Sequence, residues 1–307
     1  MKKCLSIDKR EYNVDIFENI SSDSEHIHII IPSFMPTHTG VRMTEVCIDS
    51  IRKYTSVPYT IWLVDNNSPD KYRTKFLARK DINTVFLNTV PVETLHFFDK
   101  IILSKPLKNT YPGRKRRYKH GSFSKALCFE IGLQLIPSET KYVFVMDSDC
   151  LVFKDSWLSY ILSKIDDKTK IAGFMHDRLR VNAVYSNGYI FDFQLFQKLN
   201  IDMFPNIKQK RNPSLPEYDA GDLTSIVFRE HGYKEWSCNN TYNTPELISK
   251  IDSPLSNIYS DRCFDDDWNV VYAHLGRGLS KSEGKYKQKG KTSAEKWIEF
   301  AEMHVLK

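Results

Sequence analysis

Two aspartates that lie one residue apart are the residues of this chain best placed to do chemistry. Asp147 and Asp149 follow Tyr142–Met146, an apolar run typical of a strand that is buried on both faces. Ligands bind beyond the carboxyl ends of such strands, and proteins usually hold Mg²⁺ or Mn²⁺ with one or two carboxylates plus phosphates of the ligand. The pattern therefore predicts a divalent-metal site, although solvated acids in a turn would look the same.

Two further apolar segments, at 26–31 and 59–64, predict strands that end in polar residues. The residues that follow them are Pro32 and Ser33 after the first strand, and Asp65 and Asn66 after the second. These two strand ends are expected to line up with the one that carries Asp147.

Helices are predicted at 41–54 and 122–136, where apolar residues recur at helical spacing. Alternating strands and helices predict an α/β fold with a Rossmann-like, mostly parallel sheet flanked by helices. We expect one domain with four parts: a leader or edge strand at 1–25, a nucleotide-binding half at 26–155, a less regular second half at 156–275, and a basic loop with a C-terminal helix at 276–307.

Positive charge is concentrated in two stretches, although the net charge of the 307 residues is only +6. The first stretch runs from Lys100 to Phe129 without an acid, and the second from Arg277 to Lys291 with a single glutamate. The densest part of the first is the basic patch Arg114, Lys115, Arg116, Arg117 and Lys119. Both stretches indicate contact with an anionic ligand or partner.

The cysteines and the apolar segments bear on where the protein works. None of the six cysteines has paired Cys-x-x-Cys spacing, so they are expected to be buried thiols in a reducing compartment. No apolar window reaches the roughly 18 residues of a membrane span, and the start of the chain lacks a signal-peptide core. We therefore expect a cytoplasmic protein without a transmembrane segment.

The three strand ends together resemble family 2 glycosyltransferases and related enzymes of the GT-A fold. They are Pro32-Ser33, Asp65-Asn66 and Asp147-Ser148-Asp149, and the resemblance covers roughly residues 27–155, extending loosely to about 280. It implies transfer of a sugar from a nucleoside diphosphate sugar, most simply a UDP-sugar, to an acceptor hydroxyl with Mn²⁺ or Mg²⁺ as cofactor. The family's downstream Gln-x-x-Arg-Trp is absent, so non-processive transfer is expected.

The resemblance also implies roles for individual residues. It assigns donor binding to Pro32, Ser33, Asp65, Asn66, Lys125, Asp147, Ser148, Asn187, Gly188 and Arg277, and metal binding to Asp147, Asp149 and His274. In this scheme residues 26–155 bind the donor, and residues 156–275 bind the acceptor. An Asx turn at Asp65, a plain turn at Asn187-Gly188 and an ordinary core histidine at His274 remain alternatives.

The catalytic base is assigned to Asp219 or Asp222, with Asp219 preferred. An inverting transferase needs a carboxylate that takes the proton of the acceptor hydroxyl, and this pair flanks Gly221 before a predicted helix. Acids are also favoured in the first turn of a helix, so Asp222 equally fits a capping role. The pair departs from the family's usual Glu-Asp, which leaves inversion and retention both open.

Three other functions compete with transfer to a glycan. The basic patch, interleaved with aromatic residues, suits a nucleic acid, so the acceptor could be a hydroxymethylated DNA base extruded from the duplex. A nucleotidyltransferase would need a basic, glycine-rich loop after the first strand, which residues 32–40 lack. A non-catalytic nucleic-acid-binding protein would leave the acids at the strand ends without a purpose.

Overall fold

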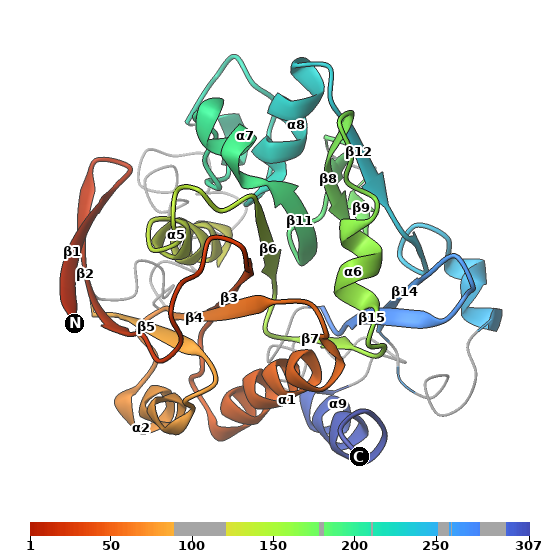
Figure 1. Ribbon diagram of the computed structural model, residues 1–307, viewed down its shortest axis with the longest axis horizontal. Helices are drawn as coiled ribbons and strands as arrows, with labels where there is room; N and C mark the ends of the chain where they lie inside the picture. The colour runs from red at the N-terminus through yellow and green to blue at the C-terminus, as the bar shows by residue number, and fades with distance from the viewer. Residues whose placement is uncertain (89–120, 178–180, 210, 251–257, 259, 277–292) are drawn as a thin grey trace, which may run out of the picture.

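The computed structural model describes residues 1–88, 121–177, 181–209, 211–250, 258, 260–276 and 293–307. A nine-stranded sheet runs through the middle of the molecule, with helices on both faces (Figure 1). In order across the sheet the strands are β1 (Lys2–Ile7), β2 (Arg10–Phe17), β5 (Asn83–Leu87), β4 (Tyr59–Asp65), β3 (Ile27–Ser33), β6 (Tyr142–Met146), β11 (Gly188–Asp192), β8 (Thr169–Gly173) and β12 (Lys234–Ser237).

Most of this sheet is parallel, because β2 and β11 alone run against the other seven strands. The centre is the parallel set β5, β4, β3 and β6, whose strands are apolar and almost fully buried, as strands covered on both faces must be. Ser33 pairs with Asp65 in the register of β3 and β4, and β6 lies on the other side of β3. The mostly parallel α/β sheet is therefore confirmed, and the ends of β4, β3 and β6 are neighbours.

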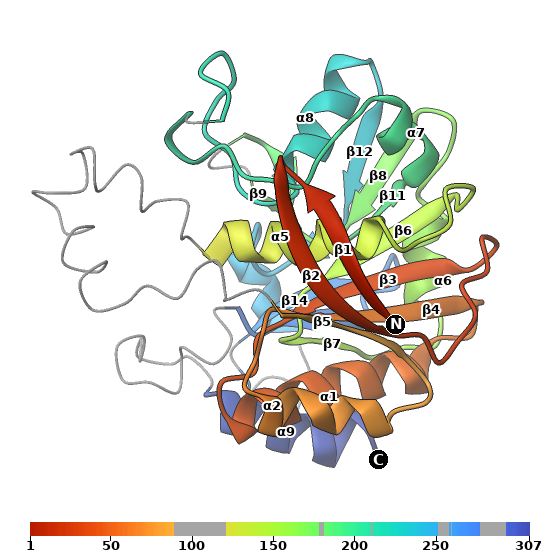
Figure 2. The ribbon, with the colours of Figure 1, turned by 90° about the vertical axis from the view of Figure 1, so that its left-hand side faces the viewer.

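Helices cover the two faces of the sheet separately (Figure 2). On one face lie α1 (His38–Tyr54), α2 (Asp70–Arg73) and α9 (Ala294–Phe300), and on the other lies α5 (Gly121–Leu133). The remaining helices are α6 (Trp157–Leu162), α7 (Phe193–Lys198), α8 (Asp222–Glu230), the short 3-10 helices η1 (Thr74–Ala78), η3 (Ile207–Gln209) and η4 (Pro245–Lys250), and the π-helical turn η7 (Ala301–Val305). α1 begins before the predicted residue 41, because Thr37 caps it by accepting a hydrogen bond from Gly40 N at 3.3 Å.

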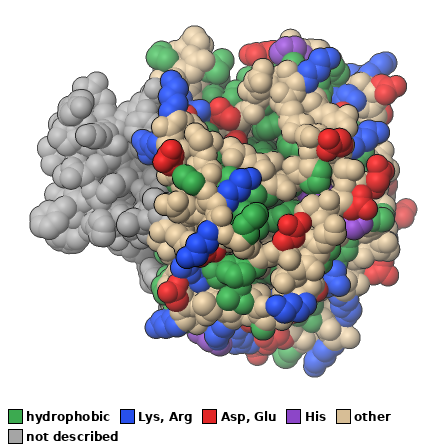
Figure 3. Space-filling view, turned by 60° about the vertical axis from the view of Figure 1, so that its left-hand side comes forward, with side chains coloured by type: hydrophobic (Ala, Val, Ile, Leu, Met, Phe, Trp, Pro, Cys, Tyr) green, Lys and Arg blue, Asp and Glu red, His purple; other side chains and the backbone are tan. Residues whose placement is uncertain are grey.

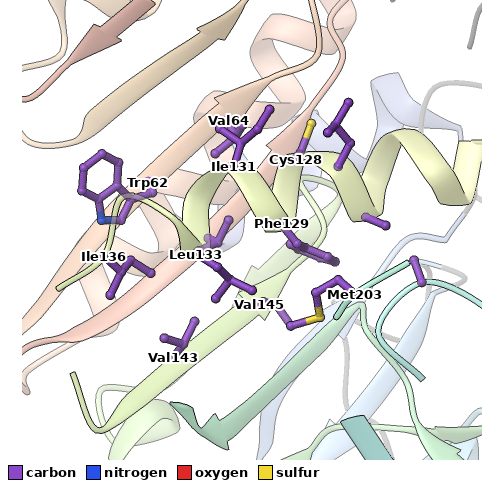
Figure 4. Close-up of a cluster of buried hydrophobic side chains, with 14 of the residues drawn as sticks. Trp62, Val64, Cys128, Phe129, Ile131, Leu133, Ile136, Val143, Val145 and Met203 are labelled. Atoms are coloured by element: carbon purple, nitrogen blue, oxygen red, sulfur yellow. The ribbon is translucent and has the colours of Figure 1, made fainter. Parts of the chain in front are cut away.

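Apolar packing fixes α5 on the sheet (Figure 4). Ile131 lies beside Val64 of β4, and Leu133 lies beside Val145 of β6. Close approach is possible because residue 132 is glycine: a Cβ there would lie 2.7 Å from Cγ2 of Ile30. Burying such side chains contributes roughly 1.5–3 kcal/mol each. The packing thereby sets where the first turns of α5, which carry Lys125, meet the strand ends.

A second, smaller sheet continues from β6. Its strands, in spatial order, are β13 (Asn239–Asn240), β14 (Asp261–Phe264), β15 (Val270–His274) and β7 (Cys150–Val152), and the short strands β9 (His176–Asp177) and β10 (Ala183–Val184) form a separate pair. β7 follows β6 after three residues, so the chain passes from the large sheet into the small one through Asp147 and Asp149. The site sequence therefore lies at the junction of two sheets.

The N-terminal residues belong to the large sheet. β1 and β2 form a hairpin whose second strand pairs with β5, and Leu5, Ile7 and Tyr12 are buried in the cluster that contains α5. Residues 2–7 and 10–17 are thus strands at one edge of the sheet. Within the described part of the chain, no helix has the length and apolar character needed to cross a bilayer.

Candidate active site

Backbone hydrogen bonds hold the turn that carries Asp147 and Asp149 on both sides. Asp147 N donates a hydrogen bond to Asn187 O at 3.1 Å, and Leu275 N donates to Asp149 O at 3.0 Å. The partners come from the residues that enter β11 and leave β15. Asp149 is buried, whereas about a quarter of the Asp147 side chain is exposed. The backbone thus holds two carboxylates at one place, where β6 ends.

His274 lies against both carboxylates. Its Nε2 is 3.5 Å from Oδ1 of Asp149 and 3.9 Å from Oδ2 of Asp147. The pairing of β15 with β7 brings it there, because His274 stands opposite Cys150 in the register. Burial by itself lowers the pKa of His274, but the carboxylates of Asp149, Asp261 and Asp147 outweigh it and raise the pKa above its usual value.

Lys125 adds a positive charge to the same group of side chains. Its Nζ is 2.7 Å from Oδ1 of Asp147, which places the lysine at the acids in this structure. Burial raises the pKa of Asp147, the nearby Lys125 lowers it, and the charge of Asp149 raises it, with a net increase. Two acids are thus held beside one lysine and one histidine, an arrangement typical of functional sites as well as of structural ion pairs.

The donor atoms of this cluster fit a divalent cation. Ligand atoms of Asp149, Cys150 and His274 lie within 4.8 Å of one another, and Asp147 is adjacent. The Cys150 thiol points to Asn187 O at 3.5 Å, and burial raises its pKa well above the usual value, so it stays a neutral thiol. Carboxylate oxygens and an imidazole remain, which suit Mn²⁺ and Mg²⁺ better than a soft ion. The sequence reasoning assigned no site role to Cys150.

Hydrogen bonds between Asp65 and Ser68 close the turn that follows β4. Asp65 is fully buried, and its carboxylate accepts hydrogen bonds from Ser68 N at 2.8 Å, Ser68 Oγ at 2.5 Å and Ser33 Oγ at 3.4 Å. Burial raises the pKa of Asp65 to about 6, against the opposing effect of these hydrogen bonds. The carboxylate thus closes the turn through the backbone three residues on, whereas an Asx turn would bond two residues on. Pro32 is half-buried at the end of β3, next to Ser33.

Asn66, by contrast, has an acceptor with no partner. Its backbone N donates to Ser33 O at 2.8 Å, while its buried side-chain Oδ1 receives no hydrogen bond from the described residues. A buried acceptor without a donor costs roughly 1–3 kcal/mol, which a ligand could offset by supplying the donor. Among the residues after β4, Asn66 therefore offers more to a ligand than Asp65 does.

Asn187 and Gly188 act through their backbone. Asn187 O accepts from Asp147 N and from the Tyr272 hydroxyl, and the Asn187 side chain is fully buried. A Cβ at Gly188 would lie 2.7 Å from that hydroxyl, so a larger residue does not fit. Through these contacts Asn187 and Gly188 support the turn that carries Asp147. Ser148, between the two aspartates, is half-buried.

The turn that carries Asp219 and Asp222, the two candidate bases, packs against Ser186, the residue before Asn187. Gly221 has φ of +79°, a conformation that favours glycine, and a Cβ on it would lie 2.9 Å from Ser186 Cβ. Asp222 is fully buried in the first turn of α8, and its Oδ2 accepts from Asp219 N at 2.8 Å, which closes the turn before the helix. It does not cap the helix, because the N-cap residue is Gly221 and α8 has no side-chain capping hydrogen bond. The Asp219 side chain is partly exposed. The structure thus separates the two acids by accessibility.

Several expected contacts lie outside the described residues. These are Arg277, the lysines that follow it up to residue 291, and the basic patch at Arg114, Lys115, Arg116, Arg117 and Lys119. On the face shown in Figure 3, the described basic and acidic side chains are interspersed and form no single basic field.

In the comparisons with known proteins, the chain is similar to solved structures but not to any family model or curated sequence. No protein-family model matches the chain, and no curated protein matches it in sequence. Among solved structures, it is similar to the mannosyltransferase PcManGT from Pyrobaculum calidifontis, in complex with GDP-Man and Mn²⁺, with a TM-score of 0.45, 14% identity, and coverage of 71% of this chain and 56% of that one.

Two further structures are similar at the same level. The glycosyltransferase GlyE of Streptococcus pneumoniae has a TM-score of 0.45 and 12% identity, with 91% of this chain and 61% of that one covered. The galactosyltransferase LgtC, solved with donor and acceptor sugar analogs, has a TM-score of 0.48 and 13% identity, with 90% and 95% covered. The chain spans only about 56–61% of the length of PcManGT and GlyE. The similarity to these three glycosyltransferases is thus one of structure, with TM-scores of 0.45–0.48 and 12–14% sequence identity.

Proposed function

We propose that the protein is a metal-dependent glycosyltransferase that moves a sugar from a nucleoside diphosphate sugar, with UDP as the first nucleotide to test, to an acceptor hydroxyl. The observation that carries the proposal is the position of His274. It comes from a strand far along the chain, yet its Nε2 lies against both Asp147 and Asp149 at the end of a central parallel strand. Ligands of open α/β sheets bind at such strand ends.

Asp149 and His274 would hold the cation, with Asp147 beside them. A bound divalent cation supplies positive charge that stabilises the diphosphate as it leaves the sugar. Lys125, 2.7 Å from Asp147, adds a mobile positive charge that can turn toward a phosphate. The chain thereby gathers cationic groups where negative charge develops during transfer.

The nucleoside would lie against the ends of β3 and β4. We assign the polar contact there to Asn66, whose buried Oδ1 can accept a hydrogen bond from a base or ribose. Asp65 and Ser33 keep the shape of that turn, and Pro32 stiffens the end of β3. Ser148 would face the ribose, and Asn187 with Gly188 would shape the sugar side of the pocket through the backbone.

For an inverting reaction, the base is Asp219. Its carboxyl is partly exposed, whereas Asp222 is fully buried and closes the turn. Asp219 would accept the proton of the acceptor hydroxyl as the bond to the diphosphate breaks. A retaining reaction would need no such base. The anomeric configuration of the product therefore decides whether this assignment applies.

The deciding experiment is a thermal-shift screen of the full chain against UDP, GDP, CDP and their common sugars, with and without Mn²⁺. A ligand that binds only the folded chain raises the melting temperature. We expect one nucleotide to do so in a metal-dependent way, with the effect lost in Asp149→Ala and kept in the control Asp166→Ala, an exposed acid that caps a turn. No stabilisation by any donor would overturn the proposal.

Two assays separate the competing functions. Pyrophosphate released from a nucleoside triphosphate and a sugar phosphate would identify a nucleotidyltransferase instead. Tight DNA binding that weakens steeply with salt, without any donor binding, would identify a nucleic-acid-binding protein, because such binding depends on released counterions. Donor hydrolysis or transfer stimulated by hydroxymethylated DNA would instead specify the acceptor.

A further inference from the structure

Asp261 faces the side of His274 that points away from the two aspartates. The residues are direct partners in the β14–β15 register, and Oδ2 of Asp261 lies 3.5 Å from Nδ1 of His274, within ion-pair distance. Nδ1 is buried and makes no hydrogen bond within the described residues, so Asp261 is the acceptor nearest to hand for its proton. The other ring nitrogen, Nε2, faces Asp149 and Asp147. The imidazole of His274 is therefore placed between carboxylates on opposite sides.

The position of the ring proton decides whether this histidine can bind a cation through Nε2. A neutral imidazole carries its proton on one nitrogen only, and a ligating nitrogen must present its lone pair. Asp147 and Asp149 alone would attract the proton to Nε2, because carboxylates accept hydrogen bonds. A carboxylate at Nδ1 opposes this and favours the tautomer with Nδ1–H, which leaves the Nε2 lone pair toward the aspartates.

Gly276 helps to keep the ring in this orientation. Its φ is +67°, and a Cβ there would lie 3.2 Å from Cε1 of His274 and 3.9 Å from Oδ2 of Asp261. The backbone of residue 276 therefore passes close over the pair. His274 is also almost fully buried, so the ring has little room to turn.

We propose that Asp261 is a positioning residue of the metal site: it holds the proton of His274 on Nδ1 and so presents Nε2 to a divalent cation beside Asp147 and Asp149. This inference rests on the proposed metal-dependent function. Nothing in the sequence reasoning pointed to Asp261, because its partner in the sheet is known only from the fold.

The test compares the full-length wild type with Asp261→Ala, Asp261→Asn and a matched control. The control is Asp267→Asn, which removes an acid from the exposed turn of the same β14–β15 hairpin. Mn²⁺ affinity is measured by titration, following the EPR signal of the free hydrated ion. Asp261→Ala should bind Mn²⁺ about 10–100-fold more weakly, as is usual when the partner of a ligating histidine is lost. Asp261→Asn should lose less, because its amide oxygen can accept a hydrogen bond from Nδ1–H, and the control should match the wild type.

A second readout follows the tautomer directly. In ¹⁵N spectra of histidine side chains, at a pH high enough for the imidazole of His274 to be neutral, Asp261→Ala should show a larger share of Nε2–H at His274 than the wild type does. A purely structural role would not move this signal. If Asp261→Ala does not fold, the Asp261→Asn variant carries both measurements.

The outcomes distinguish the inference from the function on which it rests. A wild type that does not bind Mn²⁺ overturns the metal site and the role of Asp261 together. A wild type that binds Mn²⁺, with unchanged affinity and tautomer in the Asp261 variants, overturns the role of Asp261 alone. Weaker binding in the Asp261 variants but not in Asp267→Asn, together with the tautomer shift, supports it.

Discussion

The ends of β4 and β6 carry acids in the same structural setting but with different partners. Asp65 is the last residue of β4. Its carboxylate accepts hydrogen bonds from Ser68, in the turn that follows, and from Ser33 of the neighbouring strand. Asp147 and Asp149 follow β6 and face the side chains of Lys125 and His274, which come from other elements. An acid at a strand end is thus no site by itself, since its partners decide between closing a turn and holding a ligand.

The largest expected effect comes from removing an acid at the end of β6. Asp149→Asn should abolish Mn²⁺ binding and lower the transfer rate about 10³-fold, because a bound cation is worth several kcal/mol of charge stabilisation and each 1.36 kcal/mol is tenfold. The same substitution at Asp65 should leave Mn²⁺ binding intact. Titration with Mn²⁺ measures both, and equal losses at the two positions would contradict the distinction between the two turns.

The second effect is on stability as a function of pH. Burial raises the pKa of Asp65 to about 6, so between about pH 4 and pH 6 the folded chain keeps a proton that the unfolded chain has released. The contribution of Asp65 to stability is therefore greatest at low pH and is lost as pH rises through about 6, by about 3 kcal/mol.

Urea unfolding of the wild type and Asp65→Asn at several pH values measures this loss. The variant has no proton to release, so the difference in unfolding free energy between the two chains should change by that amount across the window. A constant difference would show that the carboxyl of Asp65 titrates normally.

The third effect should also be confined to stability. Ser68 Oγ donates to Asp65 and accepts from Met35 N at 2.7 Å, so Ser68→Ala leaves two buried polar groups short of a partner. The free energy of unfolding should fall by about 1–3 kcal/mol, with Mn²⁺ affinity unchanged. Ser148→Ala, between the two aspartates, serves as the control and should change stability by less than about 0.5 kcal/mol.

The smallest effect is expected at Lys125. Lys125→Met leaves the mostly buried carboxyl of Asp147 without this partner, so the free energy of unfolding should also fall. The apparent affinity for the nucleotide-sugar donor should fall about tenfold, because a charge-assisted hydrogen bond to a phosphate is worth roughly 1.5 kcal/mol or more. Steady-state kinetics at saturating Mn²⁺ measures this as a rise in KM. A change in Mn²⁺ affinity without a change in KM would assign the lysine to the metal alone.

Local patterns predicted the elements well where burial was uniform. The apolar runs before Pro32, Asp65 and Asp147 are central strands, and the helix before β6 packs where its apolar face required. The N-terminal hairpin was less clear, because its exposed and buried residues alternate at a sheet edge and its first residues are polar.

Pairings between distant segments decide the parts of the site that the sequence did not predict. Asp261 and Cys150 reach His274 only because β14 and β7 flank β15, and no local signal encodes which short strands pair. The distinction between Asp219 and Asp222 is likewise one of burial, which depends on how Gly221 packs on Ser186. Asp65 shows the opposite case, since the serine three residues later already favours a closed turn.

The pairing of β7 with β15 also has a consequence for how the protein is made. Cys150 and His274 are opposite each other although most of the second half of the chain separates them, so this contact closes a long loop. Contacts of that kind form late, because the entropy of the loop must be overcome first. A growing chain would carry Asp147 and Asp149 well before it carried His274. Competence to bind metal would then arise only after residue 274 has been synthesised, and it would report on the pairing of β15 with β7.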